Sequence, residues 1–369
     1  MRRRLAAALG AILALALAGC GSDGDDTAER AAVPDGFFGV TPQNALTDDD
    51  FARMAEGGVE TLRVLLPWNA VDPGPETDDL DFSTIDPVIA NAARHGIEPL
   101  VYLAGMPTWA AALDGCETGC GGIPAPQSPQ TLAAWRELVA AASERYGPGG
   151  TLWREQPELP EQPVRLWQIW NEQNSATFFA PNPDVEAFAR MLTAAEAELR
   201  KRDPEATVIL GGLQPAPLGS KRRAIPAWDF LRQLYEIDGI AERFDGVAIH
   251  PYAAQVDGVA AELETIHREI ERSGDDAGIW VTEIGWSSGD GAHPLERGPE
   301  QQADRLSDAY TLMADNQEEW NLRGVFWFSW RDRTTDAVCE WCAYSGLFEQ
   351  DALEPKPAWD ALTAFTGGS

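Results

Sequence analysis

The chain has 369 residues, of which 44% are hydrophobic and 24% are charged, and its formal net charge is −31. This length suits one barrel of eight strand–helix units, and the hydrophobic share indicates a globular chain with a sizeable core. So acidic a surface repels phosphate backbones and argues against a nucleic-acid partner, but it carries no information about the fold.

The N-terminal segment has the pattern of an export signal. Three arginines at residues 2–4 precede an apolar run at residues 5–17, which is too short to span a bilayer comfortably. Residues 17–20 (Leu-Ala-Gly-Cys) resemble the lipobox of bacterial lipoproteins, which implies that Cys20 is lipidated and becomes the new N-terminus. We therefore expect a signal peptide at 1–19, a flexible acidic tether at 20–35 and one domain at 36–369. The protein would be anchored to the outer face of the cell membrane, or simply secreted if Cys20 is incidental.

After the tether, short apolar runs alternate eight times with amphipathic stretches. Continuous apolar runs are typical of parallel strands that are covered on both faces. The runs lie at residues 37–40, 61–65, 98–103, 165–170, 207–211, 246–250, 279–283 and 325–330.

The stretches between these runs have helical periodicity, as the apolar positions 132, 135, 138, 139, 142 and 146 illustrate. Positions 185, 188, 191, 192, 195 and 199 repeat the pattern, and a last helix is expected near residues 357–365. Eight strand–helix units predict the α/β class and a closed (β/α)8 barrel with a single catalytic domain.

Two of the predicted strands end in a glutamate, Glu172 after the fourth run and Glu283 in the seventh. In such barrels the chemistry lies at the carboxyl ends of the strands. A charged group there is costly to desolvate unless it has a partner or a task. Two carboxyl groups facing one another across the barrel mouth are what glycoside hydrolysis requires.

Asn-Glu at 171–172 and the glutamate at 283 resemble the signature of glycoside hydrolase clan A. The resemblance covers nearly all of residues 36–369 in strand order. It implies that Glu172 is the acid/base, that Glu283 is the nucleophile, and that Asn171 hydrogen-bonds the sugar 2-hydroxyl. The alternative is that Trp-Asn-Glu is a chance tripeptide and both glutamates cap helices.

Within the clan, His-Pro-Tyr at 250–252 is most similar to family 39 and its relatives, and less to family 5. Many family 39 members carry an extra β-sandwich, for which this chain shows no room, so the family is left open. The resemblance places His250 and Tyr252 at the cleft, one of them hydrogen-bonded to a catalytic carboxylate. A histidine bonded to a backbone carbonyl is the alternative.

Four further side chains are candidates for the substrate site. The resemblance implies that Arg63 lies near the nucleophile and keeps it ionised, although a salt bridge to an ordinary acidic loop would also explain it. It also implies that Trp330, at the end of the eighth run, stacks under the sugar. Trp68 and Trp109 are further platforms or simply packing residues, because composition alone does not separate the two uses of tryptophan.

Four cysteines remain beside Cys20, namely Cys116, Cys120, Cys339 and Cys342. An even number in an exported chain indicates two disulfides, and proximity favours Cys116–Cys120 and Cys339–Cys342. The alternative is a four-thiolate zinc site. We expect disulfides that shape the rim of the cleft.

These features predict a retaining glycoside hydrolase that acts on an oligo- or polysaccharide. The sequence indicates neither a metal nor an organic cofactor, since it contains no H-E-x-x-H, no P-loop and no dinucleotide-binding glycine motif. Three alternatives stay open: a carbohydrate-binding lipoprotein that does not cut, a transglycosylase of envelope glycans, and a polysaccharide-processing partner in a biosynthetic cluster.

Overall fold

The computed structural model describes residues 33–77, 79–215, 223–291, 293–334, 339–350 and 353–368. The expected signal peptide at 1–19, Cys20 and most of the expected tether at 20–35 lie outside the described residues, so these assignments stay predictions. Within the ranges given, no helix combines the length and the apolar character that a membrane span requires.

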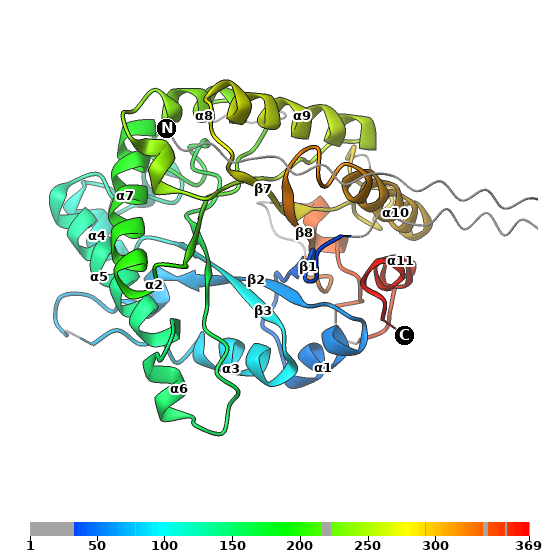
Figure 1. The fold of residues 1–369 in the computed structure, drawn as a ribbon, viewed down its shortest axis with the longest axis horizontal. Coiled ribbons are helices and arrows are strands. Elements are labelled where there is room, and N and C mark those ends of the chain that lie inside the picture. Colours follow the sequence, from blue (N-terminus) through cyan, green and yellow to red (C-terminus); the bar gives the residue numbers. More distant parts are fainter. Residues whose placement is uncertain are drawn as a thin grey trace, which may run out of the picture. The chain divides into compact units, whose positions relative to one another are not determined.

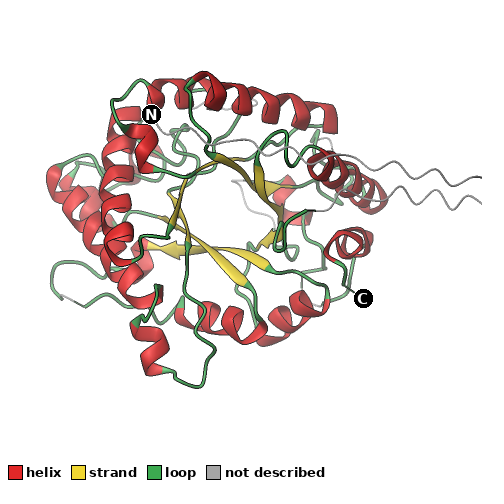
Figure 2. Cartoon of the chain, in the orientation of Figure 1, coloured by secondary structure: helices red, strands yellow, loops and turns green. Residues whose placement is uncertain are grey.

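Eight parallel strands follow one another in chain order and close into a barrel, with helices on the outside (Figure 1; Figure 2). This confirms the predicted (β/α)8 fold, and every predicted run contains a strand within a few residues of the expected bounds. The strands are β1 (Phe38–Thr41), β2 (Thr61–Pro67), β3 (Glu98–Ala104), β4 (Leu166–Ile169), β5 (Thr207–Leu210), β6 (Gly246–Ile249), β7 (Gly278–Ile284) and β8 (Leu322–Phe328).

The helices cover the outer face of the barrel because each presents an apolar stripe to it. In α5 (Pro129–Tyr146) and α7 (Val185–Arg202) the buried residues follow the predicted spacing. Helix α3 (Asp86–His95) ends at Gly96, whose φ of 68° is the left-handed conformation that favours glycine. The others are α1 (Asp48–Glu56), α2 (Trp68–Val71), α4 (Thr108–Leu113), α6 (Thr151–Glu155), α8 (Ala227–Tyr235), α9 (Val256–Arg272), α10 (Pro299–Asp315), α11 (Pro357–Thr366), and the 3-10 turns η1 (Gly119–Gly121), η2 (Ile240–Arg243) and η3 (Trp341–Tyr344).

The interior of the barrel holds an apolar layer with a more polar layer above it. The apolar layer consists of Leu100, Leu166, Ile209, Ala248, Trp280 and Phe326. Side chains two residues apart on a strand point to the same face, so the next interior positions are Tyr102, Gln168, His250, Thr282 and Phe328. The barrel is therefore packed with hydrocarbon at its centre and carries titratable groups towards its carboxyl end.

Candidate active site

A cavity of about 740 Å³ lies at the carboxyl ends of the strands. Its lining includes Thr41 and Phe328, which end β1 and β8, and Pro67, which ends β2. Glu172 and Glu283 both face it. The sequence-based expectation that these two glutamates share one cavity is therefore met.

Local backbone features aim the two carboxyl groups into the cavity. Strand β4 ends at Ile169 because Trp170 adopts a positive φ of 71°, and Glu172 also has a positive φ of 46°. Such conformations are strained for residues other than glycine and persist only where packing enforces them. Trp170 is fully buried, and its indole N–H donates to the carbonyl of Phe178 at 2.6 Å.

Strand β7 presents two successive residues to the interior instead of one. Val281 pairs with Val325 and Ile284 with Trp327, so β7 holds one more residue than β8 between these pairs. Such a bulge re-aims side chains and is frequent beside active sites. It allows Thr282 and Glu283 to face the barrel axis together.

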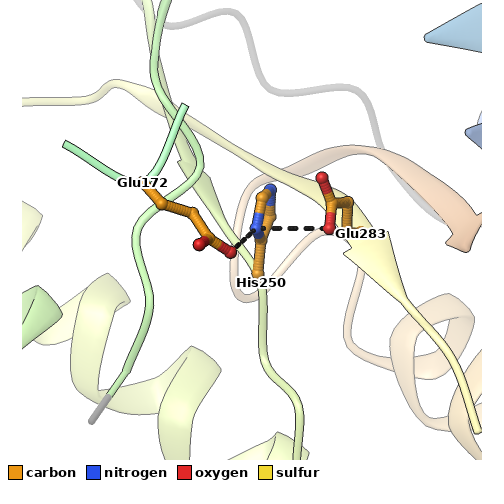
Figure 3. Close-up of side chains that lie close together, drawn as sticks. All are labelled: Glu172, His250 and Glu283. Atoms are coloured by element: carbon orange, nitrogen blue, oxygen red, sulfur yellow. Dashed lines mark hydrogen bonds and ion pairs between the residues drawn. The ribbon is translucent and has the colours of Figure 1, made fainter. Parts of the chain in front are cut away.

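The two carboxyl groups are close together, with His250 between them (Figure 3). One carboxylate oxygen of Glu172 lies within 4.8 Å of one of Glu283. The imidazole Nδ1 of His250 lies 2.8 Å from Oε1 of Glu172 and 3.6 Å from Oε2 of Glu283. Carboxyl pairs that act by double displacement are about 5–5.5 Å apart, whereas inverting pairs are about 6.5–9.5 Å apart. With their nearest oxygens within 4.8 Å, the two groups are close enough for the first class.

Glu172 is buried, and both of its carboxylate oxygens accept hydrogen bonds. Oε1 contacts Nδ1 of His250, and Oε2 accepts from the side-chain amide of Gln214. Burial raises the pKa of Glu172 above its ordinary value, and this effect outweighs the hydrogen bonds from His250 and Gln214. A carboxyl group in this environment retains its proton to higher pH than a free glutamic acid.

Glu283 lies in the opposite electrostatic environment. Oε1 accepts from Nη1 of Arg63 at 2.6 Å, and Oε2 accepts from the hydroxyl of Tyr252 at 2.9 Å. Burial alone would favour the neutral form, but the imidazole of His250, the charge of Arg63 and the Tyr252 hydrogen bond together lower the pKa of Glu283. The two carboxyl groups are thus driven apart in pKa, in the directions expected for an acid (Glu172) and a nucleophile (Glu283).

Arg63 connects three polar side chains at the carboxyl end of the barrel. Its guanidinium donates to Glu283, to the side-chain oxygen of Gln168 at 2.8 Å and to Oδ1 of Asn171 at 2.7 Å. The ring of Tyr102 lies 3.9 Å from the guanidinium carbon. Because Arg63 only donates, it fixes the amide orientation of Asn171 and leaves the amide nitrogen as the donor for the cavity.

His250 is held in place from both sides of its ring. Its Nε2 shares a hydrogen bond with the hydroxyl of Thr282 at 3.0 Å, so Nδ1 is turned towards the carboxyl groups. Gly212 makes room for this ring, since a Cβ there would lie only 1.9 Å from Nε2. Nδ1 of His250 is therefore bonded to the carboxylate of Glu172. The alternative, a histidine bonded to a backbone carbonyl, is wrong for this nitrogen.

Several of the residues expected here are placed differently by the structure. Arg63 is the third residue of β2, and its side chain reaches Glu283 as the resemblance implied. Trp330 is fully buried, donates to Asp50 at 2.8 Å and packs on Phe348, so its expected role under the sugar is wrong. Its indole belongs to the core beneath the loop after β8.

Trp68 and Trp109 are also not among the described residues that line the cavity. Trp68 is fully buried, and its indole N–H donates to Asp72 at 2.9 Å. Trp109 is half-buried in α4. Neither indole presents a face to the cavity, because each is used in packing around the loops after β2 and β3.

Four residues that sequence reasoning missed complete the site. Gln168, Gln214 and Thr282 hydrogen-bond Arg63, Glu172 and His250, respectively, and Trp341 lines the cavity. Gln168 and Thr282 carried a usable signal, since each is polar at an interior position of an apolar strand. Gln214 and Trp341 lie in loops, where no periodicity marks them.

The two cysteine pairs are bonded as the sequence favoured, Cys116 to Cys120 and Cys339 to Cys342. With each sulfur in a disulfide, the zinc alternative is wrong. Cys339 and Cys342 line the cavity, and Trp341 between them packs edge-on against Tyr252 at 5.0 Å. Cys116 and Cys120 are not among the described lining residues, so only the second disulfide contacts the cavity.

Glu172, His250 and Glu283 carry the donor atoms that divalent cations bind, and these atoms lie within 4.8 Å of one another. However, Arg63 already neutralises Glu283, and His250 and Gln214 already bond Glu172. The contacts among the described residues therefore fit a proton-transferring pair better than a cation site.

Comparison with known families addresses the second half of this barrel. Residues 213–360 match the family model described as "Glycosyl hydrolase catalytic core". This part of the chain is therefore similar to a glycosyl hydrolase catalytic core. It contains His250, Tyr252 and Glu283, whereas Arg63, Asn171 and Glu172 lie in the first half of the barrel. No curated protein sequence matches the chain.

Solved structures resemble this barrel along most of its length. A family 39 glycoside hydrolase from the gut symbiont Bacteroides cellulosilyticus WH2 has 21% identity and a TM-score of 0.62, with 89% of this chain and 63% of that chain covered. A monomeric beta-xylosidase from Caulobacter crescentus CB15 has 17% identity and a TM-score of 0.61, covering 92% and 70%. A family 5 mannosidase from Rhizomucor miehei has 14% identity and a TM-score of 0.54, covering 87% and 86%. At these identities the likeness establishes the fold, and the clan and the family stay predictions.

Proposed function

We propose that the protein is a retaining glycoside hydrolase that cleaves O-glycosidic bonds of an oligo- or polysaccharide by double displacement. One observation carries the proposal: two carboxyl groups within 4.8 Å of one another have pKa values displaced in opposite directions. Paired carboxyl groups in unlike environments divide the roles of acid and nucleophile between them. The glycosyl hydrolase core and its fold are consistent with this chemistry.

In the first step, Glu283 acts as the nucleophile. One of its carboxylate oxygens attacks the anomeric carbon, the bond to the leaving oxygen breaks, and that oxygen takes the proton of Glu172. Arg63 and Tyr252 keep Glu283 ionised for the attack. The amide nitrogen of Asn171 is placed to donate to a hydroxyl of the sugar.

In the second step, Glu172 acts as a base. It takes a proton from a water molecule, whose oxygen attacks the anomeric carbon and displaces the carboxylate of Glu283. The configuration at the anomeric carbon is thereby retained. His250 contacts both carboxyl groups and is placed to stabilise the charge that moves between them.

The substrate-binding wall in this proposal differs from the sequence-based one. Trp341, Phe328 and Tyr252 line the cavity with aromatic surface, and such surface packs well against the apolar face of a sugar ring. Trp341 takes the role under the sugar that was predicted for Trp330. The sugar and linkage stay open, because the similar structures include a beta-xylosidase, a beta-glucosidase and mannosidases.

The test is mass spectrometry of the intact protein after incubation with activated 2-deoxy-2-fluoro glycosides in several sugar configurations. We expect one covalent sugar per chain, mapped to a peptide containing Glu283, and no adduct in the Glu283→Gln variant. An adduct on another carboxylate would refute the assignment of the nucleophile. Silence across the panel and across polysaccharide screens would favour the carbohydrate-binding lipoprotein that does not cut.

We also propose that the chain is exported and held at the outer face of the cell membrane by lipid on Cys20. The support is the positive, apolar and lipobox-like order of residues 2–20. Expression of the full chain with and without Cys20→Ser, followed by detergent phase partition, tests this. The unchanged chain should enter the detergent phase and the variant should not, and equal partition of the two would overturn the anchor.

A further inference from the structure

We propose that Gln214 is a positioning residue for Glu172, whose side-chain amide holds Oε2 of the carboxyl group and favours its ionised form. The inference rests on the proposed function, because it assigns a partner to the proposed acid/base. Gln214 lies in the loop after β5 and lines the cavity. Its amide donates to Oε2, while His250 contacts Oε1.

The backbone of Gln214 is held so that its side chain has little choice of direction. Its N–H donates to Oδ1 of Asn174 at 3.1 Å, and Nδ2 of Asn174 donates back to its carbonyl at 2.8 Å. Asn174 is fully buried and lies two residues after Glu172. The N–H of Glu172 in turn donates to the carbonyl of Gly212 at 3.0 Å. The two loops therefore form one unit that carries the donor and the carboxyl group together.

The same loop is bonded to the end of β6, which carries His250. Leu213 donates to the carbonyl of Ala248 at 2.9 Å, and the N–H of His250 donates to the carbonyl of Leu213 at 2.9 Å. Gln214 and His250 thus approach Glu172 from one connected framework, one at each carboxylate oxygen. This arrangement fixes the carboxyl group without any contact from the substrate.

An amide N–H can only donate, so Gln214 stabilises the carboxylate form of Glu172 more than the acid form. It therefore opposes the effect of burial. The other titratable or charged groups that act on this part of the cavity, among the described residues, are His250 from the end of β6, Glu283 from β7, Arg63 from β2, Tyr102 from β3 and Tyr252 after β6. Of the described side chains that hydrogen-bond Glu172, Gln214 is the one that does not titrate.

This contact matters because Glu172 has opposite tasks in the two steps. It must be protonated when the leaving group departs and ionised when it accepts a proton from water. Without Gln214 the carboxyl group would keep its proton to higher pH, so the second step would slow at neutral pH. Gln214 therefore keeps the pKa of Glu172 low enough for the second step while burial keeps it high enough for the first.

The first test needs no turnover. The carboxyl carbons of glutamate are labelled with 13C in the full protein, and Glu172 is assigned from the signal lost in Glu172→Gln. In Gln214→Met, which keeps the length and removes the donor, the signal should titrate about one pH unit higher than in the unchanged protein. The control is Asn44→Ala. The amide of Asn44 also lies at this cavity but donates to the carbonyl of Asp332, so its loss should leave the titration of Glu172 unchanged. Equal titration of Glu172 with and without Gln214 would overturn the inference, whether or not the protein proves to be a glycosidase.

The second test uses dinitrophenyl glycosides, whose leaving group needs no acid, so that the second step limits the rate. The pH optimum of turnover should move upwards in Gln214→Met, and Gln214→Asn, which keeps the amide, should restore part of the shift. Far-UV circular dichroism establishes that each variant folds. If Gln214→Met is unfolded, Gln214→Ala replaces it in both tests. A uniform loss of turnover with an unmoved pH optimum would mean that Gln214 is merely structural.

Discussion

Arg63→Met should move the acid limb of the pH profile upwards. The guanidinium is fully buried and contacts Glu283 at 2.6 Å, so methionine removes its charge and its donors while it keeps an unbranched side chain of similar length. A hydrogen bond to a charged group contributes about 1.5–3 kcal/mol, and one pKa unit corresponds to about 1.4 kcal/mol. The pKa of Glu283 should therefore rise by about one to two units. Since protonated Glu283 cannot attack, the acid limb of the kcat/KM profile should move to higher pH by the same one to two units.

The same substitution should lower stability in a pH-dependent way. The folded-state pKa of Glu283 is lowered, so this group stabilises the fold above its unfolded pKa and loses that contribution as pH falls through the folded value. Breaking a buried ion pair costs about 3–5 kcal/mol. Urea unfolding should show this loss at pH 7 and a smaller one at pH 4, because the higher pKa of Glu283 in the variant leaves less of its carboxyl group ionised there.

The matched control is Arg145→Met. Arg145 forms an ion pair with Asp86 between α5 and α3, outside the barrel. Its loss should lower stability and leave the acid limb in place. An acid limb that stays fixed in Arg63→Met, or that moves downwards, would show that Arg63 does not control the ionisation of Glu283.

Three further substitutions test the site and its surroundings. Glu172→Gln should slow hydrolysis of glycosides with poor leaving groups by about 10²–10⁴-fold and spare the first step with dinitrophenyl glycosides, whereas equal losses would contradict the acid role. Trp341→Ala should raise KM by about tenfold with a small change in kcat, and Trp341→Phe should restore most of the affinity; an unchanged KM in the alanine variant would remove Trp341 from the binding wall. Burial raises the pKa of Glu262, which also lines the cavity, to about 7. A carboxyl group whose folded-state pKa is raised destabilises the fold increasingly as pH rises from its unfolded pKa to its folded pKa. In Glu262→Gln the free energy of unfolding should therefore increase by at most about 3 kcal/mol above pH 7 and hardly at all at pH 4, as measured by urea unfolding. A gain that does not depend on pH would contradict this.

The order of strands and helices was readable from the sequence because hydrophobic periodicity is a local property of the chain. Parallel strands covered on both faces need continuous apolar runs, and these are visible without any knowledge of the fold. The pair Glu172 and Glu283 was readable for a related reason. A charged residue at the end of an apolar run is rare unless it has a partner, and a closed barrel brings all strand ends to one rim.

The tryptophans illustrate what the sequence left undetermined. Trp330 and Trp341 both follow β8, and the local sequence pattern does not indicate which of the two lines the cavity. Packing on Phe348 and a hydrogen bond to Asp50 place Trp330 in the core, while the Cys339–Cys342 disulfide flanks Trp341 at the cavity. These partners are far apart in the chain for Trp330, so only the folded structure decides between the two.

Local periodicity and chain order were enough to predict the barrel and the two carboxyl groups at the strand ends, and proximity in the chain favoured the observed cysteine pairs. The difference between the two carboxyl groups depends on the fold. Burial raises the pKa of Glu172, against the hydrogen bonds from His250 after β6 and Gln214 after β5. Burial also acts on Glu283, but His250 and Arg63 on β2 lower the pKa of that group, and these partners lie on separate strands and loops. Electrostatic interactions depend on distance in space, and the closure of the barrel sets those distances.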